Sequence, residues 1–104
     1  MKVMQRGIME VAPGKTAEAM ALTEKLMALS SRYGMPTTKA RMYRPFTGGG
    51  DVMHTVVFEI EWDNLTKMAA FFEKVMADPE YQAQMTQWDV LLENHQVELY
   101  AVMQ

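Results

Sequence analysis

Two carboxylates stand two residues apart near the middle of the chain, in the segment "HTVVFEIEW" from His54 to Trp62. Paired carboxylates can carry acid–base chemistry, because burial raises the pKa of a carboxyl group and lets it hold a proton near neutral pH. On a strand, Glu59 and Glu61 share one face, with about 6.6 Å between their backbone positions. Many strands show this spacing, and cross-strand ion pairs use it equally well. Two hypotheses therefore stay open: a pair that contacts a ligand, and a pair that stabilises the register of the sheet.

Two histidines, His54 and His95, are the only imidazoles in the chain and the second set of candidates for proton transfer or metal binding. They fall near the starts of two predicted strands that a third strand separates, so roughly 10 Å lies between them. One metal ion would need both ring nitrogens at about 2 Å. The chain has no cysteine, which excludes disulfides, thiolate metal sites and thiol nucleophiles. We therefore predict no metal site and no cofactor, and the catalytic residues stay unassigned.

The spacing of apolar residues predicts the elements that position these side chains. Strands are predicted over Val3–Val11, Thr37–Phe46, Val52–Trp62 and His95–Met103. Helices are predicted over Thr16–Tyr33, from Leu65 after a cap at Asp63 or Asn64, and from Pro79 after a cap at Asp78. The predicted order is strand, helix, strand, strand, helix, short helix, strand.

The segment "TGGGD" (47–51) connects the second and third predicted strands. A phosphate-binding loop would need a lysine and a hydroxyl residue after its glycines, with a helix next. Here Asp51 and a strand follow, which predicts a hairpin loop. The order of elements is then that of a ferredoxin-like α+β domain, βαββαβ with a four-stranded antiparallel sheet, and it spans residues 1–104 as a single domain.

The two faces of this sheet carry different residues. The face expected to lie against the helices is apolar, with Gly7 placed to let a helix approach closely, and Val97, Leu99, Ala101 and Met103 supplied by the last strand. The other face mixes apolar, aromatic and charged residues, which is typical of a covered but wet surface. We predict that its ligand-binding residues are Arg6, Arg41, Tyr43, Glu59, Glu98 and Tyr100. The chain has no third layer to cover this face, so a second copy is predicted to do so.

The net charge and the lengths of the apolar segments argue against several classes of partner. A formal net charge of −3 favours neither nucleic acid nor an anionic membrane surface. No segment has the apolar length of a signal peptide or a membrane span, so a cytoplasmic protein is predicted. The twelve methionines are unusual, and methionine fills irregular cores or adaptable binding pockets.

Three segments carry a resemblance to a known family: "APGK" before the first helix, "FEIEWDNL" before the second, and "MADPEYQAQM" across the cap at Asp78. Together they resemble the dimeric α/β-barrel superfamily, in particular NIPSNAP-like proteins and relatives of the antibiotic-biosynthesis monooxygenases. The resemblance implies a homodimeric α/β barrel, in which two ferredoxin-like subunits pack sheet against sheet and enclose a cavity. Haem-degrading members carry a histidine on the second helix, and residues 65–76 contain none, which counts against haem.

Three functions remain open at this point. The first is a small-molecule-binding protein that holds an apolar or aromatic ligand in a cavity between or beneath the paired sheets. The second, which the resemblance implies, is a cofactor-independent monooxygenase or isomerase acting on an aromatic or polyketide-like compound, with Glu59 or a tyrosine moving protons. The third is a structural dimerisation module without catalysis.

Overall fold

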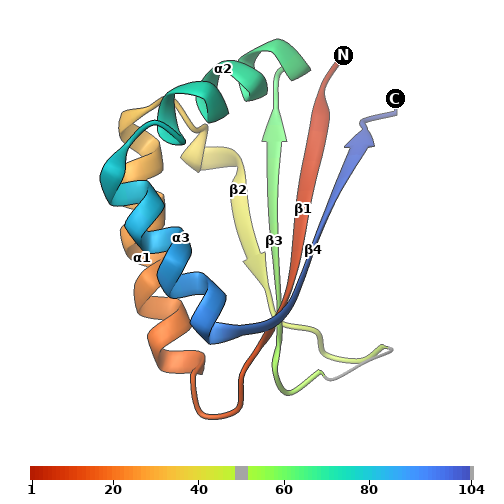
Figure 1. The fold of residues 1–104 in the computed structure, drawn as a ribbon. Coiled ribbons are helices and arrows are strands. Elements are labelled where there is room, and N and C mark those ends of the chain that lie inside the picture. Colours follow the sequence, from red (N-terminus) through yellow and green to blue (C-terminus); the bar gives the residue numbers. More distant parts are fainter. Residues whose placement is uncertain (49–51, 104) are drawn as a thin grey trace.

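A computed structural model describes residues 1–48 and 52–103 of the chain (Figure 1). The elements, in chain order, are β1 (Val3–Val11), α1 (Thr16–Arg32), a 3-10 turn (Thr37–Lys39), β2 (Ala40–Tyr43), β3 (Thr55–Trp62), α2 (Leu65–Val75), α3 (Pro79–Leu91) and β4 (Leu92–Ala101). This is the βαββαβ order with one additional helix before the last strand, and it confirms the predicted α+β ferredoxin-like fold.

The four strands form one antiparallel sheet in the order β2-β3-β1-β4. Because β1 lies between β3 and β4, its residues Val3 to Glu10 have a partner on both sides. Arg6 is opposite Glu59 on β3 and Glu98 on β4, while Gly7 is opposite Phe58 and Val97. The register therefore places the charged and the apolar sets on opposite faces, as the alternation of the sequence predicts.

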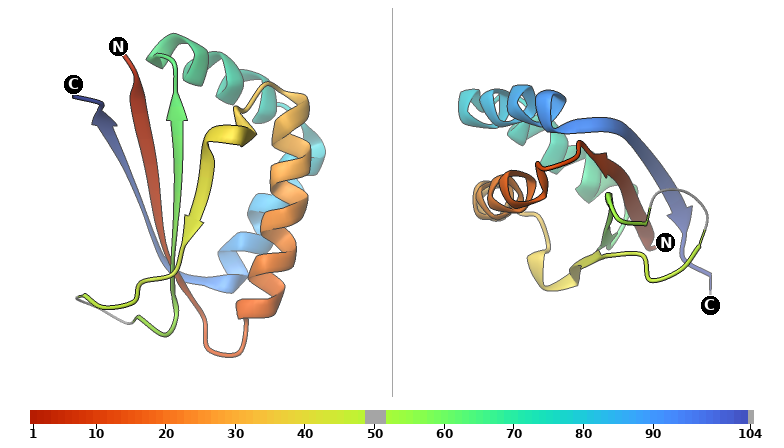
Figure 2. Two further views of the ribbon diagram at one scale, coloured as in Figure 1. Left: turned by 180° about the vertical axis from the view of Figure 1, so that it is seen from behind. Right: turned by 90° about the horizontal axis from the view of Figure 1, so that it is seen from below.

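All three helices lie on the same side of the sheet, which the view along the strands shows (Figure 2). The core between the two layers has two clusters of buried residues. The first is built from Met9, Val11, Ala19, Leu22, Val56, Trp88 and Leu91, and the second from Ile60, Trp62, Phe71 and Val75. Phe58 packs against both clusters, so it joins the two halves of the core.

The helix starts follow their predicted caps. The Asn64 side chain accepts a hydrogen bond from the backbone N–H of Lys67 at 2.8 Å and begins α2. Asp78 accepts from the backbone N–H groups of Glu80 and Tyr81, and Pro79 occupies the first turn of α3. These bonds satisfy N–H groups that have no partner inside a helix.

Strand boundaries differ from the predictions in three places. The second strand is shorter than the predicted Thr37–Phe46, because Thr37–Lys39 forms a 3-10 turn and the strand ends two residues before Pro45, which has no N–H to donate. The third strand begins at Thr55, and β4 begins at Leu92, directly after α3. Part of the "TGGGD" hairpin loop, residues 49–51, lies outside the described residues.

The inner side of β4 departs most from expectation. Its apolar residues do share the face of Gly7 and Gln5, but Val97 and Leu99 remain 56% and 52% exposed. Met103 is 91% exposed. The helices bury residues of β1 and β3, and β4 lies at the sheet edge beyond β1 (Figure 1). One side of the space between the two layers is therefore open along β4.

Candidate functional site

A cavity of about 710 Å³ lies between the helices and the inner face of the sheet, and we call it the helix-side cavity. Six aromatic residues line it: Phe58, Trp62, Phe71, Phe72, Tyr81 and Trp88. Five of the twelve methionines also line it: Met9, Met27, Met35, Met68 and Met85. Thioether and aromatic surfaces adapt to the shape of an apolar molecule. The methionine-rich composition thus serves a cavity wall as well as the core.

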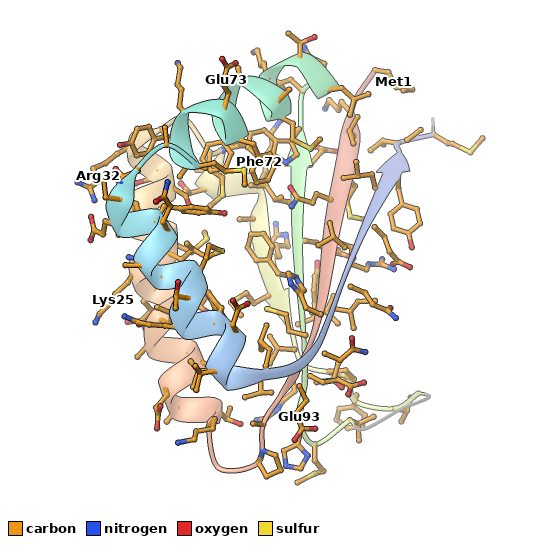
Figure 3. The ribbon with its side chains drawn as sticks, in the orientation of Figure 1. Met1, Lys25, Arg32, Phe72, Glu73 and Glu93 are labelled. Carbon is orange, nitrogen blue, oxygen red and sulfur yellow. The ribbon has the colours of Figure 1, made fainter. Side chains whose placement is uncertain are left out.

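The aromatic end of the cavity is held by contacts between β3 and α2. The ring centroids of Trp62 and Phe71 are 5.2 Å apart, and those of Phe71 and Phe72 are 5.1 Å apart in an edge-to-face arrangement. The indole N–H of Trp62 donates to the Gln5 side-chain oxygen at 3.0 Å, which fixes the ring against β1. Phe72 points inward from α2 whereas its neighbour Glu73 points to solvent (Figure 3). These rings form a rigid apolar wall.

Gly7 lies on the sheet floor of the cavity. Gly7 is not among the glycines with a positive φ, so its backbone conformation does not require glycine. A Cβ added there would meet a single neighbour within 4 Å, the His95 Nε2 atom at 3.6 Å. The expectation that Gly7 allows a helix to approach closely is wrong, because no helix atom comes within that distance. The missing side chain leaves room for something else above the floor.

Polar residues gather where α3 passes into β4. Asp89, Glu93, Asn94 and His95 all line the cavity there, and all four side chains are exposed. The Asn94 side chain accepts from the backbone N–H of His95 at 2.9 Å. The His95 ring lies on the inner face, next to Gly7. The cavity therefore has an apolar interior and a polar rim, the usual arrangement of a small-molecule site.

The six residues predicted to bind a ligand lie on the other face of the sheet. Arg6 donates from Nε to Glu59 Oε2 at 2.8 Å, and its Nη2 is 2.6 Å from the same oxygen. The guanidinium carbon of Arg6 is 5.2 Å from the centroid of the Tyr100 ring, and Tyr100 donates to Glu98 at 2.7 Å. The structure thus brings Arg6, Glu59, Glu98 and Tyr100 into one network.

This network raises the pKa of two of its members, Arg6 and Tyr100. The hydrogen bond that Arg6 donates to Glu59 is the main cause that raises the pKa of Arg6, so the guanidinium stays charged. The hydrogen bond to Glu98 is the main cause that raises the pKa of Tyr100, so the phenol stays neutral. The Arg6–Glu59 pair joins two adjacent strands in register, which is the contact that the structural hypothesis for Glu59 predicts.

Arg41 and Tyr43, with Glu59, line a second and smaller hollow of about 280 Å³ on the outer face. Arg41 is opposite Glu59 in the register of β2 and β3. None of the six predicted residues lines the helix-side cavity. Their role in ligand binding stays a prediction, and it concerns the outer face of the sheet.

Within residues 1–48 and 52–103, no group of three or more histidine, aspartate and glutamate side chains is arranged to hold a metal ion. His54 and His95 lie on opposite sides of β1, because the His54 carbonyl accepts from Val11 on the β3 side and His95 is opposite Met9 on the β4 side. In the same part of the chain, no helix has the length and apolar character needed to cross a bilayer.

Solved structures with this architecture are known. A NIPSNAP domain protein from Burkholderia xenovorans superposes with a TM-score of 0.75 at 22% identity, covering 99% of this chain and 95% of that chain. The cofactor-independent oxygenase SnoaB from Streptomyces nogalater gives a TM-score of 0.72 at 14% identity, with coverages of 99% and 94%. An antibiotic biosynthesis monooxygenase gives 0.70 at 11% identity, with coverages of 98% and 99%. This chain shares their fold.

The comparison confirms the resemblance that the three short segments indicated, at the level of architecture. No sequence-family model and no curated protein sequence matches the chain. Because the sequence identities are 22% or lower, the likeness to NIPSNAP proteins and monooxygenases concerns the fold alone. The side chains of this chain, rather than its fold, therefore indicate which molecule it could bind.

The residues that line the helix-side cavity all lie outside the predicted site, and Gly7 and His95 are two of them. Gly7 carried a detectable signal, since a glycine in a strand interior often marks the close approach of a ligand or another backbone. His95 has the same alternation as Val97 and Leu99, so its face was predictable. The space that the helices leave above both residues was not predictable, because it depends on how far apart the two layers pack.

Proposed function

We propose that this protein binds a small, largely apolar molecule in the helix-side cavity. The observation that carries the proposal is a space of about 710 Å³ lined by aromatic and methionine side chains. Protein interiors are close-packed and leave few voids larger than a water molecule, whereas ligand sites occupy about 300–1,000 Å³. A space of this size favours ligand binding over a purely structural dimerisation module.

The side chains around the cavity have distinct roles in this proposal. The rings of Trp62, Phe71 and Phe72 form the closed end against which a flat apolar group packs. Gly7 provides a floor without a side chain, and Val97 and Leu99 provide apolar surface along the open side. A ligand would enter along β4, where no helix covers the sheet, and its polar end would stay at the rim near His95.

Native mass spectrometry of protein purified without ligand removal, followed by crystallography of the same sample, tests this proposal. We expect a bound mass and electron density between α2, α3 and β1. As a quantitative check, titration with 2-naphthalenemethanol, a neutral two-ring compound, should give saturable heat in calorimetry. A cavity filled by rearranged side chains in the crystal, together with no saturable heat, would contradict ligand binding.

A second candidate function is a cofactor-independent oxygenase or isomerase that acts on an aromatic compound. The favouring observation is the His95 imidazole beside the cavity floor, where it could take a proton from a bound phenol. SnoaB, which shares the fold, is a cofactor-independent oxygenase. The sequence predicted Glu59 or a tyrosine as the group that moves protons. Glu59 lies on the outer face, whereas one tyrosine, Tyr81, lines the cavity. Oxygen consumption with naphthalene hydroquinones, reduced at least tenfold in His95→Gln, would support this function.

We also propose that a second copy covers the outer face of the sheet, as the homodimeric α/β barrel requires. On that face Ile8 and Val57 lie side by side in register, next to the Arg6–Glu59 pair. Apolar residues beside paired charges suit a covered surface better than a solvated one. The six predicted residues would then line the space between the paired sheets, separate from the helix-side cavity.

A further inference from the structure

We propose that the ligand of the helix-side cavity carries a positive charge, such as a protonated amine, on an apolar aromatic body. This inference rests on the proposed function, since it concerns the same cavity, and it names the chemical class of the ligand. It is carried by the charges that line the cavity and by the rings behind them.

The cavity lining is electrostatically one-sided. Two carboxylates, Asp89 and Glu93, line it, and no lysine or arginine of the described residues does. Within residues 1–48 and 52–103, neither carboxylate side chain takes part in an ion pair or a hydrogen bond. Some other acidic residues at the surface do find partners, such as Glu80 with Arg32 and Asp63 with Lys67. The rim therefore presents two unpaired negative charges to whatever enters.

Among the described residues, no lysine or arginine of the helix layer lines this rim. Lys25 and Arg32 of α1 point outward, away from the sheet (Figure 3). Arg6, the nearest cation on β1, lies on the outer face and is held there by Glu59. The potential at the cavity mouth is consequently negative, and a negative mouth raises the local concentration of cations.

The interior behind the rim is also suited to a cation. The faces of aromatic rings attract a positive charge, and tryptophan does so most strongly. Trp88 and Asp89 are consecutive on α3 and both line the cavity, the buried ring inside and the exposed carboxylate at the rim. Burial raises the pKa of Tyr81, which keeps its ring neutral. An anionic ligand would instead meet two like charges and no cation.

Three naphthalene compounds with the same ring and different head groups test the inference. These are 2-naphthylmethylamine, which is cationic at pH 7, 2-naphthalenemethanol, which is neutral, and 2-naphthoate, which is anionic. Dissociation constants are measured by calorimetry on the full chain at low ionic strength. We expect the amine to bind about tenfold more tightly than the alcohol, from two exposed carboxylates and a cation–π contact. The carboxylate should bind most weakly of the three.

The preference should depend on the rim. In the double variant Asp89→Asn with Glu93→Gln, the amine and the alcohol should bind within about twofold of each other. The matched control is Glu24→Gln with Glu73→Gln, which removes the same net charge from exposed positions on α1 and α2 outside the cavity lining. This control should keep the preference. Raising the salt concentration to 0.5 M should reduce it in the unmodified protein.

The possible outcomes separate the two proposals. Equal affinity for amine and alcohol, tighter binding of the carboxylate, or an amine preference that survives in the rim variant would overturn the cationic ligand and leave the binding cavity in place. No binding of any of the three compounds would overturn the cavity as a binding site for two-ring aromatics, and the cationic ligand with it.

Discussion

Gly7 lies in the interior of β1, where glycine normally weakens a strand because it costs backbone entropy and packs nothing. Its backbone does not need glycine, and the space above it is limited only by the His95 ring at 3.6 Å from a Cβ position. A residue that lowers stability without a backbone reason indicates a use for the space. Stability and ligand binding should therefore respond in opposite directions when this position is filled.

The substitution Gly7→Val tests that opposition. Valine should raise the free energy of unfolding by about 0.5–1 kcal/mol, because it removes the glycine penalty and favours a strand. It should also weaken binding of 2-naphthalenemethanol at least tenfold, because the isopropyl group occupies the cavity floor. Denaturant unfolding and calorimetry measure the two effects. Gly34→Ala is the control: its φ of 95° disfavours any Cβ, so stability should fall while binding is kept.

Glu59 gives a second test at the scale of one residue. The side chains of Arg6 and Glu59 retain 35% and 23% exposure, so the pair is partly screened by water. Glu59→Gln should lower the free energy of unfolding by roughly 0.5–1 kcal/mol and leave binding in the helix-side cavity unchanged, because Glu59 lies on the opposite face. A loss of ligand affinity at constant stability would instead support its predicted role as a ligand contact.

At the scale of elements, α3 depends on the contacts of Asp78. Its carboxylate caps the helix through two backbone N–H groups and also accepts a short hydrogen bond from the Tyr33 hydroxyl at the end of α1. One side chain thus begins α3 and joins it to α1. Because α3 carries Tyr81, Met85 and Trp88 into the cavity, the cap also positions a cavity wall.

Removal of this cap should be measurable as a loss of stability. Asp78→Ala should lower the melting temperature by about 4–8 °C, as expected when a helix cap is lost from a domain of this size. Asp78→Asn keeps an oxygen that can accept the cap bonds and should lose less. The comparison by differential scanning calorimetry separates the hydrogen-bonding geometry from the charge. Equal melting temperatures for all three proteins would contradict a capping role.

The same residue predicts a pH dependence. The Tyr33 hydrogen bond is the main cause that lowers the pKa of Asp78 in the folded protein. The charged carboxylate therefore adds stability at pH values above its unfolded-state pKa of about 4. This contribution is lost as the pH falls through the lower pKa of the folded state. Between pH 5 and pH 2, the unmodified protein should lose more stability than Asp78→Asn. A parallel decline of the two in urea unfolding would show that Asp78 does not contribute.

At the scale of the whole molecule, the two faces of the sheet have different surroundings. The inner face forms the cavity with the helices, whereas the outer face has no cover within the described chain (Figure 2). The proposed second copy would pack against the outer face through residues such as Val57. Covering the outer face would leave the rim at Asp89 and Glu93 accessible, because the rim belongs to the inner face.

A charge placed on the outer face should therefore dissociate the dimer. Val57→Lys should convert a dimer at micromolar concentration into a monomer in light scattering, because a lysine there would be buried without a partner. Val90→Lys is the control, since Val90 is 75% exposed on α3 and lies outside the proposed interface. A monomeric unmodified protein, or a Val57→Lys variant that remains dimeric, would contradict the homodimer.

The sequence alone determined the order of the elements, the caps at Asn64 and Asp78, and the face on which each strand residue lies. These properties are local: they follow from periodicity over a few residues and from hydrogen bonds within one turn. Strand ends were less predictable, as the 3-10 turn at Thr37–Lys39 shows, because extended and turn conformations compete over the same short segment.

The tertiary structure decided where space remains. The helix-side cavity exists because the helices leave the inner side of β4 uncovered, and that depends on how whole layers pack. Gly7 and His95 are far apart in the sequence, yet the pairing of β1 with β4 places the imidazole beside the glycine. No local pattern encodes the distance between two layers, because it is the combined result of every side chain between them.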